Sequence, residues 1–144
     1  MDNTDKIELA RHYMGIWNAG EDERLLTYAH PDLTVYYSHY PQTFRGAEEY
    51  RKMLQATYSF FPDIKIELMN VIPSDKAVTV YWEYTGTHMA GNLFGKEATG
   101  RFVQVKGLTV LELEGEQVIK EYGVADNLAL LYAITGSASS GMQP

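Results

Sequence analysis

Two side chains with acid–base chemistry, His88 and Asp126, lie near the ends of two segments with strand-like sequence. A carboxylate can take a proton from carbon, and an imidazole can hold the negative charge that develops on oxygen in the resulting enolate. Strand alternation predicts that Trp82 and Tyr84 share a face with His88, and that Tyr122 shares one with Asp126. Aromatic walls would raise the basicity of the carboxylate by desolvation and would stack on a flat substrate. The sequence therefore predicts Asp126 as a general base and His88 as its electrophilic helper.

Each of these residues also has a structural explanation. Asp126 directly precedes a helical pattern, and aspartate is among the best residues for capping a helix N-terminus. Capping would occupy the carboxylate and stabilise its charged form, which weakens it as a base. Asn127 is an equally good cap, so Asp126 is free for chemistry only if Asn127 takes that duty. His88 could be a buried histidine whose hydrogen bonds are satisfied within the fold.

The same reasoning extends to the expected pocket wall. His39 lies beside a short strand that could border the mouth of a pocket, whereas His12 lies within a predicted helix and His30 precedes a proline. The substrate-binding residues predicted from the sequence are Trp82, Tyr84, Tyr122, His39, Trp17 and Phe102. No pair of histidines has metal-ligand spacing, and neither a phosphate-binding glycine loop nor a nucleophile elbow is present. We therefore expect neither a metal nor an organic cofactor.

Helices are expected to dominate the first part of the chain. Apolar residues recur every three or four positions between residues 6 and 18, which predicts a first helix. A short second helix is expected before Pro31, and a third begins after Gly46 and ends at Pro62. A short strand, residues 33–38, separates the last two.

After Pro62 the period changes to two, which predicts strands. We expect strands over residues 64–69, 78–88 and 99–113, followed by a last strand that ends near Ala125. A short helix should contain Leu128 and Leu131. Residues 1–135 are then one domain, and residues 136–144 have the composition of a disordered tail. Helices followed by hairpin-connected strands predict an α+β fold in which one curved antiparallel sheet wraps around helices and leaves a cavity.

Composition restricts the classes of partner. The chain has 144 residues and a net charge of −7, so it lacks the basic surface that a nucleic-acid partner requires. It has no cysteine, which excludes disulfides and thiolate chemistry. The polar amino terminus shows no secretory signal, and the longest apolar stretch is too short to span a membrane. We expect a cytoplasmic protein that acts on a small hydrophobic or aromatic molecule.

The order and spacing of several short motifs resemble one family. These motifs are Phe61-Pro62-Asp63, Gly86-Thr87-His88, Gly95, Thr99-Gly100-Arg101, and Asp126 followed by Leu128 and Leu130-Leu131. In this order the chain resembles the SnoaL-like polyketide cyclases and, more widely, the NTF2-like superfamily. The resemblance implies a conical α+β barrel, with one strongly curved and mostly antiparallel sheet wrapped around three N-terminal helices and a short C-terminal helix. It also implies a homodimer and cofactor-free intramolecular aldol ring closure, with Asp126 as base beside His88.

The chain departs from the family pattern in places. Tyr122 replaces the tryptophan that is usual in the last strand, and Tyr132-Ala133-Ile134 replaces the usual end of the terminal helix. These changes affect the pocket wall more than the fold. Three functions remain open at this point: a cyclase-type enzyme, an isomerase or dehydratase that uses the same base, and a binding protein for a hydrophobic small molecule.

Overall fold

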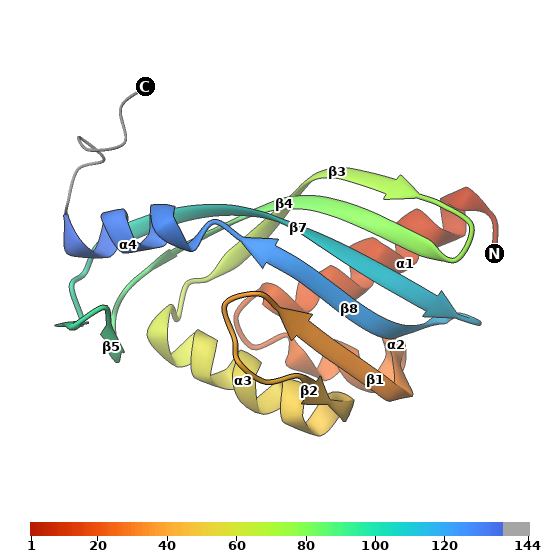
Figure 1. Cartoon of the computed structure of the whole chain (residues 1–144), viewed down its shortest axis with the longest axis horizontal. Coiled ribbons are helices and arrows are strands. Elements are labelled where there is room, and N and C mark those ends of the chain that lie inside the picture. The colour runs from red at the N-terminus through yellow and green to blue at the C-terminus, as the bar shows by residue number, and fades with distance from the viewer. Residues whose placement is uncertain (137–144) are drawn as a thin grey trace.

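A computed structural model of the chain describes residues 1–136 (Figure 1). The sheet has six strands in the order β2-β1-β8-β7-β4-β3. Their bounds are β1 Ala29–Tyr37, β2 Phe44–Arg45, β3 Lys65–Pro73, β4 Ala77–Thr87, β7 Phe102–Glu114 and β8 Gln117–Ala125. All neighbours are antiparallel except β1 and β8, which run parallel. The strand order leaves β2 and β3 as edges, so this curved sheet is open rather than a closed barrel.

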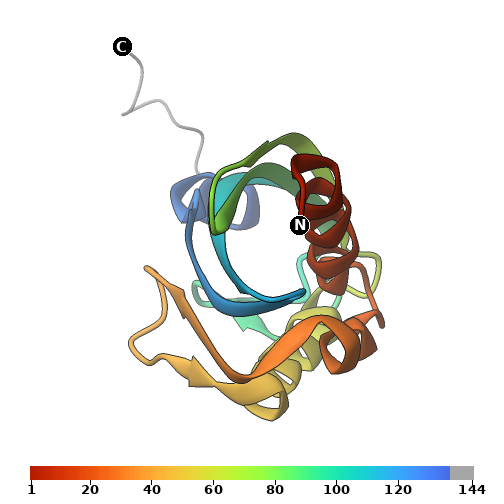
Figure 2. The same ribbon diagram turned by 90° about the vertical axis from the view of Figure 1, so that its right-hand side faces the viewer.

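The helices lie mainly on the concave side of this sheet. They are α1 Asn3–Met14, α2 Leu25–Tyr28, α3 Gly46–Phe60 and α4 Asn127–Thr135, with 3-10 turns η1 Gly15–Trp17 and η2 Asp22–Arg24. Figure 2 shows the strands curving around a central space, with α1 across its open side. The space is filled by one large cluster of buried side chains drawn from α1, α3 and the sheet. The expected α+β architecture is confirmed.

Local sequence explains where the helices begin and end. Asp2 caps α1 by accepting a hydrogen bond of 2.8 Å from the Asp5 N–H. At the start of α3, the Glu49 carboxylate accepts the Arg45 N–H at 2.6 Å. Gly136 ends α4 with φ of +68°, a left-handed conformation that glycine adopts at little cost.

Several predicted boundaries change. β1 begins at Ala29 and so includes His30 and Pro31, which were expected in a connection. Proline is compatible with this position because Pro31 lies between Ala29 and Thr34, where the pairing of β1 with β8 is interrupted. Residues 99–101 precede β7 rather than belonging to it, and a two-stranded hairpin, β5 Asn92–Leu93 and β6 Lys96–Glu97, fills the predicted loop. The expected tail falls almost wholly on residues 137–144, which lie outside the described residues.

Candidate active site

A cavity of about 640 Å³ lies between the concave face of the sheet, α3 and the start of α4. Its lining is mostly apolar and aromatic, which suits a hydrophobic ligand with a few polar groups to orient it. The aromatic residues of the lining are Trp17, Tyr37, Tyr40, Phe44, Phe60, Phe61, Trp82, Tyr84 and Phe94. Four of the residues predicted to bind substrate, namely Trp17, His39, Trp82 and Tyr84, therefore border this cavity.

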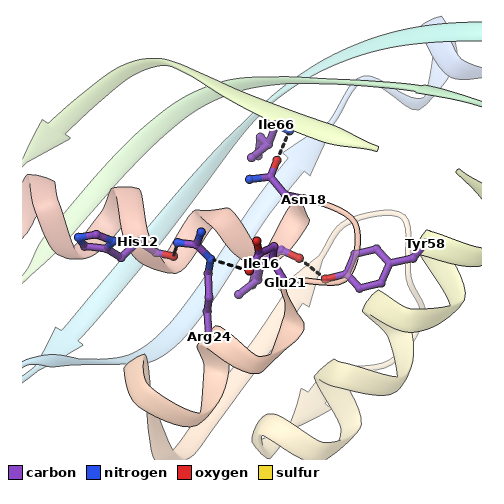
Figure 3. Close-up of polar contacts among 7 residues, drawn as sticks. All are labelled: His12, Ile16, Asn18, Glu21, Arg24, Tyr58 and Ile66. Carbon is purple, nitrogen blue, oxygen red and sulfur yellow. Dashed lines mark hydrogen bonds and ion pairs between the residues drawn. The ribbon is translucent and has the colours of Figure 1, made fainter. Parts of the chain in front are cut away.

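Hydrogen bonds on both sides of Trp17 hold this residue in the wall. Figure 3 shows the Tyr58 hydroxyl donating to the Ile16 carbonyl and the Ile66 N–H donating to the Asn18 side chain, the latter at 2.9 Å. These contacts tie η1 to α3 and to β3. The wall at Trp17 is thus positioned by two elements that the sequence pattern could not bring together.

A buried carboxylate, Glu121, is hydrogen-bonded to Tyr37, one of the residues that line the cavity. Its side chain accepts hydrogen bonds from the hydroxyls of Tyr13 and Tyr50, each at 2.7 Å, and from that of Tyr37. Burial raises the pKa of Glu121 and the three hydroxyl donors lower it. Burial, together with the charge of Glu121, raises the pKa of all three tyrosines, so they remain hydrogen-bond donors.

A chain of hydrogen bonds connects this cluster to the cavity. The indole N–H of Trp82 donates to the Thr109 hydroxyl at 2.9 Å, and the hydroxyls of Thr109 and Tyr37 are also 2.9 Å apart. Because Tyr37 donates to Glu121, Thr109 donates to Tyr37. This series of hydrogen bonds begins at Trp82 and ends at Tyr37, and both residues line the cavity. Glu121 was not predicted as a site residue, because a glutamate in a strand ordinarily faces solvent.

His39, Tyr40 and Tyr84 are the polar cavity residues best placed for chemistry. Among the described residues, the side chains of these three make no hydrogen bond, although the Tyr40 backbone N–H donates to the Tyr37 carbonyl at 3.0 Å. His39 is an exposed residue on the cavity lining, and partial burial of its ring lowers its pKa below the ordinary value, which favours the neutral imidazole at pH 7. The rings of His39 and Tyr40 are 4.4 Å apart. Tyr40 follows His39 in a connection where strand alternation gave no signal, and it was not predicted.

The two phenols remain protonated. Burial raises the pKa of Tyr40, and burial followed by the charge of Tyr40 raises the pKa of Tyr84. Both residues line the cavity. Two neutral hydroxyl donors and one neutral base thus border a single apolar space.

Asp126 does not line this cavity. Its carboxylate accepts the Ala129 N–H at 3.1 Å and caps α4, while the neighbouring Asn127 lines the cavity instead. For Asp126 to act in chemistry, Asn127 had to cap the helix. The structure has the opposite arrangement, with Asp126 as the cap and Asn127 on the cavity wall. The cap forms at Asp126 because its backbone leaves the strand there, so its side chain reaches the first turn of the helix.

His88 is buried and both of its ring nitrogens have hydrogen-bond partners. Nε2 lies 2.6 Å from the Gly91 carbonyl, and Nδ1 lies 3.0 Å from the Thr99 hydroxyl. The ring is fully buried and does not border the cavity. The expected meeting of His88 and Asp126 in one apolar pocket is thus not found, and the fold satisfies His88 internally.

Tyr122 and Phe102 also lie outside the cavity. Tyr122 packs on the outer side of β8, where the Lys120 ammonium is 5.3 Å from its ring centroid, and Phe102 is 60% exposed. The inward residues of β8 are Val118 and, beyond a register shift, Glu121, Gly123 and Ala125, so the inward face predicted for Tyr122 was wrong. The pattern misled because its inward positions carry an acidic residue and a glycine, whereas aromatic and apolar residues face out.

Comparison with known proteins assigns the chain to a family. The model of the SnoaL-like polyketide cyclase family matches residues 7–134. The chain belongs to this family. Among solved structures, a protein from Jannaschia sp. CCS1 assigned as a SnoaL-like polyketide cyclase has 25% identity, a TM-score of 0.80 and 92% coverage of each chain. No curated protein matches the chain significantly.

Two further structures share the fold. A protein from Acidithiobacillus ferrooxidans ATCC assigned as a polyketide cyclase has 22% identity and a TM-score of 0.82, with 96% of this chain and 100% of that chain covered. A Catenulispora acidiphila DSM 44928 protein with a ketosteroid isomerase-like fold has 16% identity and a TM-score of 0.75, with 89% and 92% covered. These relatives confirm the NTF2-like fold, and family membership supports a cyclase-type function.

Residues 1–136 contain neither a cluster of metal-ligating side chains nor a membrane-spanning helix. No group of three or more histidine, aspartate or glutamate side chains in this region could hold a metal ion. No helix in the same region is long and apolar enough to cross a membrane.

On the outer face of the sheet, Leu108 and Val124 are about half exposed, at 48% and 54%. The expected homodimer would use this face, and it stays a prediction.

The capping role of Asp126 predicts how its variants behave. Asp126→Ala should lower the free energy of unfolding by about 1 kcal/mol, because the first turn of α4 loses its acceptor. Asp126→Asn should be close to wild type, since asparagine caps equally well. Urea denaturation measures both. Equal stability of the alanine variant and the wild type would contradict the capping role.

Proposed function

We propose that this SnoaL-like protein catalyses cofactor-free enolate chemistry of the cyclase type, with His39 as the general base. The substrate is a small hydrophobic molecule, aromatic or polyketide-like, that carries a carbon flanked by carbonyls. The observation behind the proposal is that His39 borders an apolar cavity, where partial burial lowers its pKa and favours the neutral imidazole. A base needs to be unprotonated at the working pH and within reach of the ligand, and His39 meets the first condition and borders the space for the second.

The two phenols supply the second half of the chemistry. When His39 removes a proton from carbon, negative charge develops on the neighbouring carbonyl oxygen. Tyr40 and Tyr84 are neutral donors on the wall of the same cavity, so either hydroxyl can donate to that oxygen. The enolate then attacks a second carbonyl of the same molecule, and the imidazolium returns its proton to the alkoxide that forms. This completes an intramolecular aldol ring closure without any cofactor.

Shape and apolarity of the cavity favour this intramolecular reaction. Trp17 and Trp82 offer flat surfaces for stacking, and Trp82 and Tyr37 are held by the hydrogen bonds behind them. A rigid wall limits the conformations of a flexible chain and brings the two reacting carbons together. An isomerase or dehydratase would use the same base, and the identity of the product distinguishes these reactions from ring closure.

The second candidate is a binding protein for a hydrophobic small molecule. It is favoured because the Asp126 carboxylate and both ring nitrogens of His88 already make hydrogen bonds within the fold. Neither residue is therefore free for chemistry in this structure. Such a protein would use the same cavity and bind the same class of ligand, but it would not accelerate proton transfer.

Deuterium exchange separates an enzyme from a binding protein. In deuterium oxide, the wild-type protein should accelerate exchange at the methylene between the two carbonyls of an aryl β-keto ester, followed by NMR. Ala56→Trp is the control, because Ala56 lines the cavity at the exposed surface of α3 and a tryptophan there blocks entry while His39 stays in place. Its exchange should fall to the buffer rate. Binding of the ester without accelerated exchange in the wild type would reject the enzymatic proposal.

A further inference from the structure

The loop of residues 91–100 closes part of the cavity. Leu93 and Phe94 of this loop line the cavity wall, and the β5–β6 hairpin within it forms a sheet separate from the six-stranded one. Phe94 and Ala98 have positive φ values of 52° and 37°, a conformation that side chains other than glycine rarely adopt. A backbone held in this way requires contacts elsewhere to maintain it.

His88 provides such contacts at both ends of the loop. At the first end, its Nε2 lies 2.6 Å from the Gly91 carbonyl, and because a carbonyl only accepts, Nε2 carries the hydrogen. At the other end, Nδ1 accepts the Thr99 N–H at 3.2 Å and lies 3.0 Å from the Thr99 hydroxyl. The ring is therefore the neutral tautomer with its hydrogen on Nε2, and it links the two ends of the loop.

The backbone of His88 adds two more bonds on the Thr99 side. Its N–H donates to the Arg101 carbonyl at 3.0 Å, and its carbonyl accepts the Gly100 N–H at 2.8 Å. The imidazole is enclosed by the rings of Phe60 and Phe61, whose centroids lie 6.4 and 6.0 Å away. All four polar groups of this buried residue thus bind within or beside the loop, and the ring is fixed against the end of α3.

We propose that His88 is a positioning residue that pins the loop of residues 91–100 as a lid over the cavity. Without the imidazole, the Gly91 end is released while the backbone bonds near Thr99 remain, so the hairpin swings away and carries Leu93 and Phe94 with it. The lid then controls how fast a hydrophobic ligand leaves. This inference depends on the proposed function only in that the cavity takes a ligand, and it needs no chemical step.

Trypsin cleavage after Lys96 reports on the lid. Lys96 is exposed in β6, inside the loop, and it should be cut slowly while the hairpin is pinned. His88→Asn keeps an acceptor near the position of Nδ1 but cannot reach the Gly91 carbonyl. We expect cleavage after Lys96 at least tenfold faster than in the wild type, with an unchanged rate after Lys106 in β7. Lys96→Gln in the same background removes the band and identifies it.

A second measurement separates a lid from a general structural role. The dissociation rate of 1-anilinonaphthalene-8-sulfonate from the cavity, measured by stopped-flow fluorescence, should rise at least tenfold in His88→Asn at an unchanged far-UV circular dichroism spectrum. Wild-type values for both cleavage and dissociation in the folded variant would overturn the proposal. Neither measurement involves turnover, so a failed lid and a failed enzymatic proposal give different results.

Thr99→Val decides the matter if His88→Asn does not fold. Valine keeps the shape of threonine but removes the hydroxyl that lies 3.0 Å from Nδ1 and 3.2 Å from the Arg101 N–H. Cleavage after Lys96 should rise about threefold, since the Thr99 N–H bond to the ring remains. An unchanged cleavage rate in this variant would reject His88 as the pin.

Discussion

Glu121→Ala is expected to lower the free energy of unfolding by about 3 to 5 kcal/mol, because three buried tyrosine hydroxyls lose their shared acceptor. The tyrosines come from α1, β1 and α3, so the loss acts on the whole core. Urea denaturation followed by circular dichroism measures the change. Glu67→Ala is the matched control, because Glu67 is an exposed glutamate in β3 of the same sheet, and its removal should cost less than about 0.5 kcal/mol.

Glu121→Gln tests the charge separately from the shape. Burial raises the pKa of Glu121 in the folded state above its unfolded value of about 4.3. The folded protein therefore holds this proton more tightly, and its stability relative to the glutamine variant is greatest below pH 4. That advantage should fall as the pH rises toward the raised pKa. A stability difference that is constant from pH 4 to pH 8, or that grows with pH, would contradict this assignment.

His39→Gln is expected to slow deuterium exchange of the aryl β-keto ester by about 10²- to 10⁴-fold, the usual contribution of a positioned base. Its melting temperature should stay at the wild-type value, since His39 has no hydrogen-bond partner among the described residues. Binding of the ester, followed by the fluorescence of Trp17 and Trp82 on the cavity wall, should also persist. His12→Gln is the control, because His12 is an exposed histidine of α1 outside the cavity lining.

The pH profile gives an independent readout for His39. Burial lowers its pKa below the ordinary value of about 6.5, and only the unprotonated imidazole accepts a proton. The wild-type exchange rate should therefore fall as the pH drops through a value below 6.5. This acid limb of the pH–rate profile should be absent in His39→Gln. Full activity in His39→Gln would remove this residue as the base. Loss of activity in Asp126→Asn at unchanged stability would then restore Asp126 to the role predicted from the sequence.

The fold was largely predictable from the sequence, because periodicity reports which face of each element is buried. Val78, Val80 and Trp82 do share the buried face of β4, as their alternation predicts. The third helix ends at Phe60, just before the proline that was expected to stop it. The family resemblance added the arrangement of these elements as one curved sheet around the helices, and the family match over residues 7–134 confirms the resemblance.

The candidate site was only half predictable. Trp17, His39, Trp82 and Tyr84 border the cavity as expected, since each is a large or polar side chain at an element end or on a buried face. His88 and Asp126 were expected to meet there, and each instead bonds to nearby backbone. Sequence shows that a residue is capable of chemistry, but it does not show whether a nearby N–H or carbonyl already occupies that residue.

The sequence by itself determined the classes of element, the family and the apolar character of the pocket, because these depend on residue type and spacing along the chain. The tertiary structure decided which polar groups are free. It buried Glu121 among three tyrosines from distant segments, turned Tyr122 outward and left the His39 imidazole without a hydrogen bond to any described residue. The physical reason is that hydrogen bonds join groups that are far apart in sequence, and a side chain can act on a ligand only when the fold leaves it unsatisfied.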